Sequence, residues 1–147
     1  MTPAGSDTAS AIRARLASWD EALRAKDLDA LMAHYAPEIV VFDLAPPLVY
    51  AGLAAYRANF ADWFPTWDGP IGIARRDVVI EAAGGLALVR SLHRLTGRRT
   101  DGTATDTWVR ATIAFRSMGG AWMIVHEHLS VPFYMEPPFR AAIDLRP

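Results

Sequence analysis

An acidic residue stands inside an otherwise apolar stretch, VVFDLAPPL, which runs from Val40 to Leu48. Valine and phenylalanine are typical of a strand inside a sheet, where an ionised carboxylate is costly unless it has a partner. Asp43 therefore has two interpretations. Its carboxylate either accepts backbone N–H groups of the loop at Pro46 and Pro47, as in an Asx turn, or points into an apolar cavity as a general base or polar anchor.

Two candidate partners for Asp43 lie further along the chain. His93 shares its strand parity with Val89 and is a candidate acid, base or hydrogen-bond donor. Arg110 shares a face with Trp108 in the run DTWVRATIAF. Its guanidinium either lies over the surface of the sheet or forms a fork for a carboxylate or enolate oxygen.

The triplet HEH provides a further candidate, His128, and raises the question of a metal. His126 and His128 share one face of a strand, but a catalytic zinc needs a third protein ligand and only distant residues could supply it. We therefore expect no metal and no other cofactor. Alternate residues of this strand point to opposite faces, and it stays open whether His128 or the pair Glu127 and Leu129 faces a cavity. Both sets contain apolar residues, and a single bulge would exchange them.

Composition excludes several classes of function. The 147 residues are 52% hydrophobic, enough for a single domain, 1–147, with a sizeable core. The net charge of −1 comes from acidic and basic residues mixed along the chain, so neither nucleic acid nor an anionic membrane is an expected partner. With no cysteine, no signal-peptide pattern and no membrane-spanning run, a cytoplasmic protein is expected.

Periodicity predicts the elements that must position these side chains. Helical spacing predicts helices over Asp7 to Lys26, over the stretch from Leu28 to Tyr35, and from Leu53 to about Phe64. Strands are predicted over Glu38 to Leu44, Ile71 to Ala82, Leu86 to Gly97, Thr105 to Ser117 and Ala121 to Val131. The last four form an antiparallel meander, so we predict an α+β fold with three helices covering one face of a strongly twisted sheet. The apolar tail after Val131 is expected to pack along the body or a partner subunit.

The order of elements and the stretch AKDLDALMAHYAPEIVVFD resemble the nuclear transport factor two-like superfamily, whose cone-shaped domains are also called cystatin-like. In that family a helix ends at a GD or KD step, a short Leu-rich helix ends at Tyr-Ala, and a strand carries an acidic residue near its end. The matching residues here are Asp27, Leu28, Leu31, Tyr35, Ala36 and Asp43, and Gly52 opens the third helix as in the family. The stretch AWMIVHEHLSVP is similar to the last strand of SnoaL-like ketosteroid isomerase homologues and of the calcium/calmodulin-dependent kinase association domain.

This resemblance implies that Asp43 faces a cavity, because ketosteroid isomerases carry their base at that place. Those enzymes also use a Tyr on the first helix and a protonated Asp on a later strand to stabilise the enolate. These positions correspond here to Trp19 and to Arg110 or Thr112, so the resemblance implies a retained base without the usual oxyanion hole. We expect the cavity to be lined by the aromatic residues Trp19, Tyr56, Phe60, Trp63 and Trp108, each of which could instead be plain core.

Two classes of function are consistent with this reading. The first is binding, with isomerisation, cyclisation or dehydration, of a small apolar carbonyl-type molecule by Asp43 with His93, Arg110 and His128. The alternative is a non-catalytic dimeric binding or assembly module with a vestigial pocket. A homodimer through the outer face of the sheet is expected in either case. The apolar residues on that strand parity are Val40, Phe42, Leu86, Leu88 and Leu92.

Overall fold

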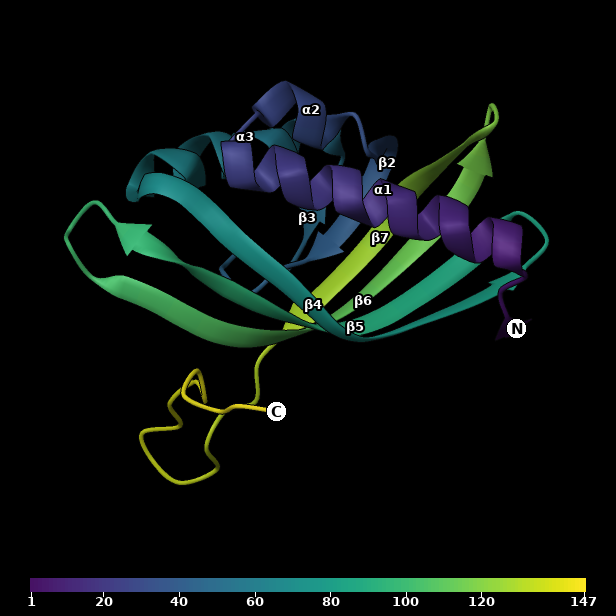
Figure 1. Cartoon of the computed structure of the whole chain (residues 1–147). Coiled ribbons are helices and arrows are strands. Elements are labelled where there is room, and N and C mark those ends of the chain that lie inside the picture. The colour runs from purple at the N-terminus through teal and green to yellow at the C-terminus, as the bar shows by residue number, and fades with distance from the viewer.

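The computed structural model describes residues 1–147, with three helices packed on one face of a curved sheet (Figure 1). The predicted α+β fold is confirmed. The elements are β1 (Thr2–Pro3), α1 (Ser6–Ala25), α2 (Leu28–Met32), β2 (Tyr35–Phe42), β3 (Tyr50–Ala51), α3 (Leu53–Trp63), β4 (Trp67–Ala83), β5 (Leu86–Arg99), β6 (Ala104–Met118) and β7 (Ala121–Ser130). A single 3-10 turn, Phe64–Thr66, joins α3 to β4.

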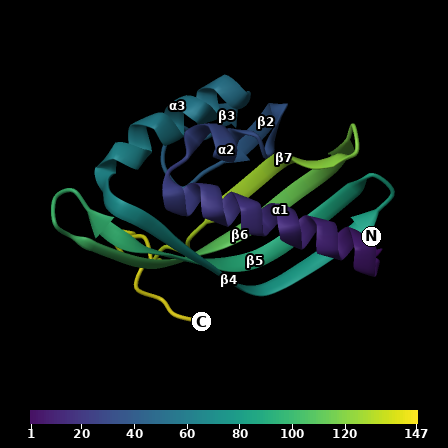
Figure 2. The same cartoon turned by 45° about the horizontal axis from the view of Figure 1, so that its top comes forward.

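The helical layer is fixed by its caps and its apolar faces. α1 buries residues at helical spacing, among them Ile12 and Trp19, against the sheet. Lys26, in the left-handed conformation, ends α1, and the Asp27 side chain accepts the Ala30 N–H to begin α2 at once. Figure 2 shows α1 running across the sheet, with α2 and α3 beside its C-terminal end.

The sheet has the strand order β1-β4-β5-β6-β7-β2-β3. Its four long strands, β4 to β7, form the predicted antiparallel meander. β2 adds to β7 in parallel, and the two-residue strands β1 and β3 close the edges. The end of β2, Phe42, therefore lies beside His128 near the C-terminal end of β7, which brings residue 43 close to the last strand.

The first strand and the second helix have other bounds than the sequence suggested. The pattern predicted a helix through Tyr35 and a strand from Glu38 to Leu44, whereas α2 ends at Met32 and β2 spans Tyr35–Phe42. Tyr35 pairs with Ile124 and is buried, so tertiary packing overrides its helical spacing. The register shifts beyond Tyr35, in the part of β2 that contains Pro37, which has no N–H to donate. Asp43 is thus the first residue after the strand.

A bulge in β7 decides which side chains of that strand face the helices. Phe115 of β6 pairs with Ile124, but the neighbouring residue Ala114 pairs with His126, so Val125 is the extra residue. The inward parity changes there. Ile124 before the bulge and Glu127 after it are both buried on the helix side of the sheet.

The tail after β7 leaves the sheet on the side opposite the helices (Figure 1). It folds back on itself through a bridge between Phe133 and Ala141, and Arg146 donates a hydrogen bond to the Asp106 carbonyl of β6. The predicted packing along the body is therefore present in part, while Phe133 and Met135 stay exposed. None of the helices is long and apolar enough to cross a membrane.

Gly97→Ala should destabilise the protein by about 1–3 kcal/mol because of overpacking. A Cβ at position 97 would lie 2.7 Å from Cζ3 of Trp67, a buried ring that also carries the Arg99 guanidinium 4.0 Å from its centroid. The measurement is the free energy of unfolding in urea. Gly85→Ala is the matched control, because the nearest atom, Ser117 Cβ, is 3.9 Å away. Equal effects of the two substitutions would contradict the close packing at Gly97.

Candidate functional site

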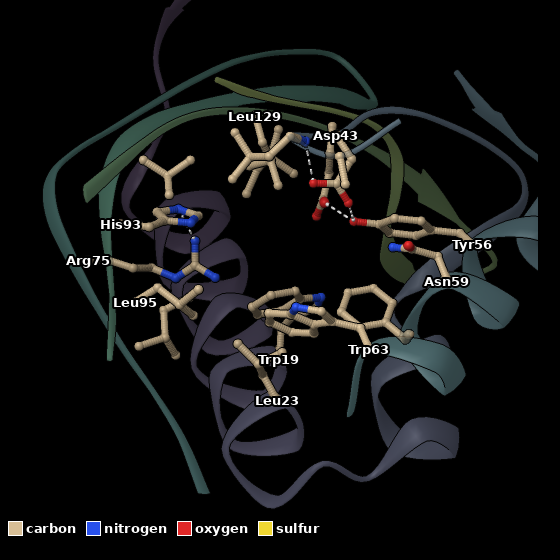
Figure 3. A pocket seen from close by; sticks show the side chains of 17 residues that line it. Trp19, Leu23, Asp43, Tyr56, Asn59, Trp63, Arg75, His93, Leu95 and Leu129 are labelled. Atoms are coloured by element: carbon tan, nitrogen blue, oxygen red, sulfur yellow. Dashed lines mark hydrogen bonds between the residues drawn. The ribbon is translucent and has the colours of Figure 1, made fainter. Parts of the chain in front are cut away.

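A mostly apolar cavity of about 170 Å³ lies between the helices and the concave face of the sheet. Twelve of its 17 lining residues are hydrophobic. This volume is below the roughly 300–1,000 Å³ of pockets for drug-sized ligands, so the cavity fits a small molecule. Figure 3 shows its polar groups gathered in two places, with Asp43 and Tyr56 on one side and Arg75 and His93 on the other.

The first polar group is a pair of carboxyls joined by one hydroxyl. The Tyr56 hydroxyl lies 3.2 Å from Asp43 Oδ2 and 3.5 Å from Glu127 Oε2. Glu127 Oε1 accepts a hydrogen bond from the Tyr35 hydroxyl at 3.3 Å, and that hydroxyl accepts the Trp19 indole N–H at 2.8 Å. Helix α1, helix α3 and strands β2 and β7 all contribute to this network.

Asp43 combines both interpretations suggested by the sequence. Its Oδ1 accepts the N–H of Leu44 at 2.7 Å and so holds the loop, while its Oδ2 faces Tyr56 at the cavity. Burial raises the pKa of the Asp43 carboxyl, and the hydrogen bonds from Leu44 and Tyr56 oppose that rise. The result is a carboxylate that is more basic than a surface aspartate.

Glu127 is the more deeply buried of the two carboxyls, with 3% of its surface exposed. Burial, and then the nearby Asp43 charge, raise the pKa of Glu127 from 4.5 to about 7. The two carboxyls therefore differ in proton affinity at neutral pH. Burial also raises the pKa of the Tyr35 and Tyr56 hydroxyls well above the usual value, so both keep their protons as donors.

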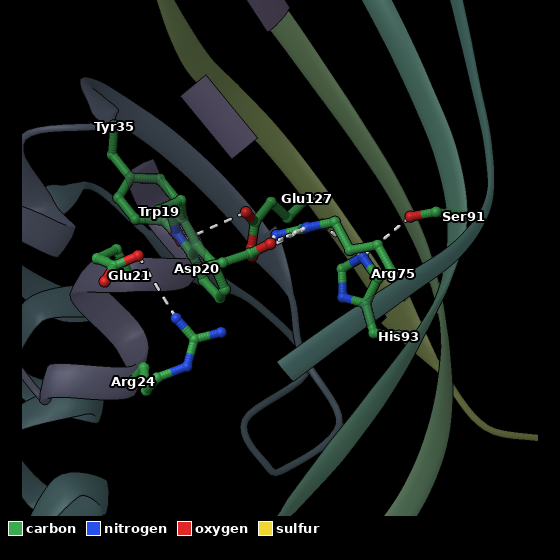
Figure 4. A network of polar contacts seen from close by, with 9 residues as sticks. All are labelled: Trp19, Asp20, Glu21, Arg24, Tyr35, Arg75, Ser91, His93 and Glu127. Atoms are coloured by element: carbon green, nitrogen blue, oxygen red, sulfur yellow. Dashed lines mark hydrogen bonds and ion pairs between the residues drawn. The ribbon is translucent and has the colours of Figure 1, made fainter. Parts of the chain in front are cut away.

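The second polar group is centred on Arg75 of β4, shown in Figure 4. Its Nε and Nη2 donate to the carboxylate of Asp20 on α1, and both side chains are largely buried. Nη1 lies 2.6 Å from Nε2 of His93, and the Ser91 hydroxyl lies 3.0 Å from the same nitrogen. The guanidinium carbon lies 5.4 Å from the centre of the Trp19 ring.

Arg75 fixes the state of His93. A guanidinium carries only donors, so Nε2 of His93 must accept, and the ring is neutral with its proton on Nδ1. Burial and the Arg75 charge lower the pKa of His93 from 6.5 to about 3, in agreement with this assignment. His93 is therefore a hydrogen-bond donor at neutral pH rather than an imidazolium acid.

Most of the predicted site residues lie around the cavity. The structure brings together Asp43, His93, Trp19, Tyr56, Phe60 and Trp63. No group of three or more His, Cys, Asp or Glu side chains could hold a metal ion. The polar groups instead suit acid–base chemistry on an organic molecule.

Three predicted residues belong to the opposite face of the sheet, which corrects the predicted partnership of Arg110 and His128 with Asp43 and the predicted place of Trp108 in the cavity lining. Arg110 is exposed and donates to Ser130, and His128 is exposed beside Phe42. Trp108 shares their parity, because Val109 between Trp108 and Arg110 points inward. The bulge at Val125 removes His128 from the cavity and puts Glu127 there instead.

Two side chains of the second polar group were not identified from the sequence. Arg75 follows Ile71 and Ile73 at strand spacing, and that alternation with two inward residues could have identified it. Its partner Asp20 follows Trp19 on α1, and no sequence signal connects the two across 55 positions. Glu127 was left open because of the bulge.

Known proteins that resemble this chain agree on its family. The SnoaL-like domain family matches residues 12–134. A crystal structure of an NTF2-like protein of unknown function from Pseudomonas putida KT2440 has 34% identity and a TM-score of 0.88, over 97% of this chain and 99% of that one. No match was found among curated proteins.

Two more distant structures show likeness of fold alone. A ketosteroid isomerase-like protein from Erwinia carotovora atroseptica has 19% identity and a TM-score of 0.74, over 86% of this chain and 97% of that one. A provisional scytalone dehydratase from Novosphingobium aromaticivorans has 18% identity and a TM-score of 0.79, over 92% and 91%.

Glu127→Gln should stabilise the protein increasingly as the pH rises. In the folded protein Glu127 keeps its proton up to about pH 7, whereas the unfolded chain loses it near 4.5. The unfolded state binds fewer protons in this window, so the wild-type protein loses stability as the pH rises through it. The glutamine side chain has no proton to lose, so the stability of the Glu127→Gln variant does not fall for this reason. The difference in unfolding free energy, variant minus wild type, should grow by about 2–3 kcal/mol between about pH 4 and pH 8 in urea titrations.

The difference is the informative quantity because His93 acts in the opposite direction. Its lowered pKa means that folded-state stability is lost as the pH falls below 6.5 toward 3, in both proteins alike. Glu136→Gln makes the same change in the exposed part of the tail and is the control for the substitution itself. A flat difference for Glu127→Gln would show that Glu127 titrates normally.

Proposed function

Because the chain belongs to the SnoaL-like domain family, we propose that its cavity takes a small, mostly apolar carbonyl compound and catalyses proton transfer beside the carbonyl, as an isomerase or a dehydratase does. The observation that carries the proposal is the Tyr56 hydroxyl, which lies between the buried Glu127 carboxyl and the half-buried Asp43 carboxyl at one side of an apolar cavity. The names of two relatives, ketosteroid isomerase-like and scytalone dehydratase, describe reactions of this type.

Asp43 is the base in this mechanism. It is half-buried at the cavity, so a substrate can reach it, and burial makes it more basic than a surface aspartate. A carboxylate whose proton affinity is raised removes a weakly acidic C–H more readily. The hydrogen bonds from Leu44 and Tyr56 hold the group in one orientation while it acts.

Glu127 and Tyr56 supply the complementary acid. With its pKa raised to about 7 by burial and the nearby Asp43 charge, Glu127 holds a proton much of the time at neutral pH. Tyr56 contacts both groups, so its hydroxyl can pass a proton from Glu127 toward Asp43 or the substrate. Two carboxyls of unequal proton affinity thus provide an acid and a base, which both isomerisation and dehydration require.

Asp43→Asn should reduce α-proton exchange by about 10²–10⁴-fold, the usual contribution of a general base. The assay follows the exchange of the α-hydrogens of small cyclic ketones in deuterated water by NMR, because this step is common to isomerases and dehydratases. Asp62→Asn, on the exposed side of α3, is the matched control and should retain the wild-type rate. The fold should survive in both variants, which thermal unfolding verifies.

Wild-type protein that binds ketones without accelerating exchange would contradict the catalytic proposal. The chain would then be the non-catalytic binding or assembly module that the sequence left as the alternative. Equal rates for Asp43→Asn and wild type would instead remove Asp43 from the role of base.

We also propose that two copies pair through the outer face of the sheet. Phe42 and Leu86 are 37% and 49% exposed there, and Phe42 lies edge-on against His126 and His128. Apolar side chains gathered on one face of a sheet are typical of an interface between subunits.

Sedimentation velocity at micromolar concentration should show a dimer. Phe42→Asp should shift the protein to monomer, because a charge within the proposed interface would have to be desolvated. Leu48→Asp is the control, since Leu48 is 93% exposed on the loop after β2 and away from the sheet face. A wild-type monomer would overturn the dimer proposal.

A further inference from the structure

Arg75 has hydrogen-bond capacity beside the cavity that the protein does not use. A guanidinium has five N–H groups. Here Nε and Nη2 each donate one N–H to Asp20, and Nη1 donates one to His93. The two remaining N–H groups have no acceptor within the protein. The Arg75 side chain is only 9% exposed, yet it lines the cavity. Donors held in a site of low exposure are available to a ligand.

His93 adds a third donor of this kind. Both Arg75 and Ser91 use Nε2, which leaves the proton on Nδ1, and that N–H also has no protein acceptor. The indole N–H of Trp19, which also lines the cavity, is already given to Tyr35. The donors without acceptors at Arg75 and His93 therefore lie across the cavity from Asp43 (Figure 3).

We propose that Arg75 and His93 form the oxyanion-binding end of the cavity, so that the substrate is an enolisable ketone or aldehyde whose oxygen lies against these donors while its α-carbon faces Asp43. This inference rests on the proposed function and names the substrate class of the same site. It also assigns the task of the missing Tyr/Asp pair to residues on β4 and β5.

The electron count of the step is balanced. Asp43 takes the α-proton, the C–H electron pair becomes the C=C bond of the enolate, and the carbonyl π pair moves onto oxygen. The new negative charge then lies on the oxygen, where prearranged N–H donors stabilise it more than they stabilise the neutral carbonyl. Return of a proton to the same or another carbon completes the reaction without an oxidant or reductant.

Asp20 makes this end selective for charge that develops during the reaction. Its carboxylate neutralises Arg75 and holds the guanidinium against Trp19 and His93. The end thus acts through fixed N–H dipoles, with little net charge, which need no reorientation as the enolate forms. Arg90 and Arg110, by contrast, are on the outer face of the sheet and do not line this cavity.

The test uses 4-nitrophenol as an enolate mimic, because the phenolate absorbs at longer wavelength than the neutral phenol. The background is Asp43→Asn, which resembles the protonated Asp43 of the enolate complex. We expect the pKa of the bound phenol to be about one unit below its pKa in water. The absorbance of the phenolate measures this ionisation directly. An unchanged pKa of the bound phenol would overturn the proposal, and this readout needs no further variant and no turnover.

A second measurement assigns the effect to Arg75. Adding Asp20→Asn and Arg75→Gln together removes both charges of the pair while keeping polar partners, and should weaken phenolate binding about 10- to 100-fold. Adding Arg90→Met, which removes one guanidinium from outside the cavity, should change it less than about twofold. Equal binding by the triple variant would overturn the assignment.

These results separate the inference from the proposed function. Ionised phenol bound by a protein that catalyses no ketone exchange would leave the oxyanion-binding end standing without the catalytic proposal. Ketone exchange that depends on Asp43 but is unaffected by Asp20→Asn with Arg75→Gln would retain the catalytic proposal and overturn the oxyanion-binding end.

Discussion

The cost of burying charge is the constraint on which the cavity depends. Glu127 lies in the core with almost no exposure, and an unsatisfied carboxyl there would cost more than the hydrophobic core could easily offset. The two tyrosine hydroxyls and a raised pKa provide the solution, since the group can stay neutral and hydrogen-bonded. Trp19, Tyr35 and Tyr56 therefore have two roles: their rings pack in the core, and their polar atoms form the hydrogen-bond network that satisfies the buried Glu127 carboxyl.

Asp20 and Arg75 solve the same problem differently. Their charges stay ionised but neutralise each other through several N–H donors, with the Trp19 ring covering the guanidinium. Removing either partner alone would leave an unpaired buried charge, which makes the pair strongly interdependent. Because Trp19 touches both polar groups, helix α1 connects the two sides of the cavity and holds them at a fixed separation.

The shared fold does not transfer a mechanism from one relative to another. The distant isomerase-like and dehydratase-like structures have the same architecture at less than 20% identity, so each site must be judged by its own side chains. Here the carboxyls at the cavity lie on β7 and just after β2, while the unused donors are an arginine and a neutral histidine. The fold supplies a mostly apolar cavity, and the side chains along its strands determine which chemistry is possible there.

The sequence by itself determined the α+β class, the three helices and the meander, since these depend on local periodicity and turn residues. That Asp43 and His93 face the cavity was implied only by the family resemblance, because the local pattern left both open. The sequence did not determine the exchange of His128 for Glu127, which follows from one bulged residue, Val125. Nor did it connect Asp20 with Arg75. The face that a strand residue occupies and the partner that a charge finds depend on pairing between distant segments, and only the tertiary structure contains that pairing.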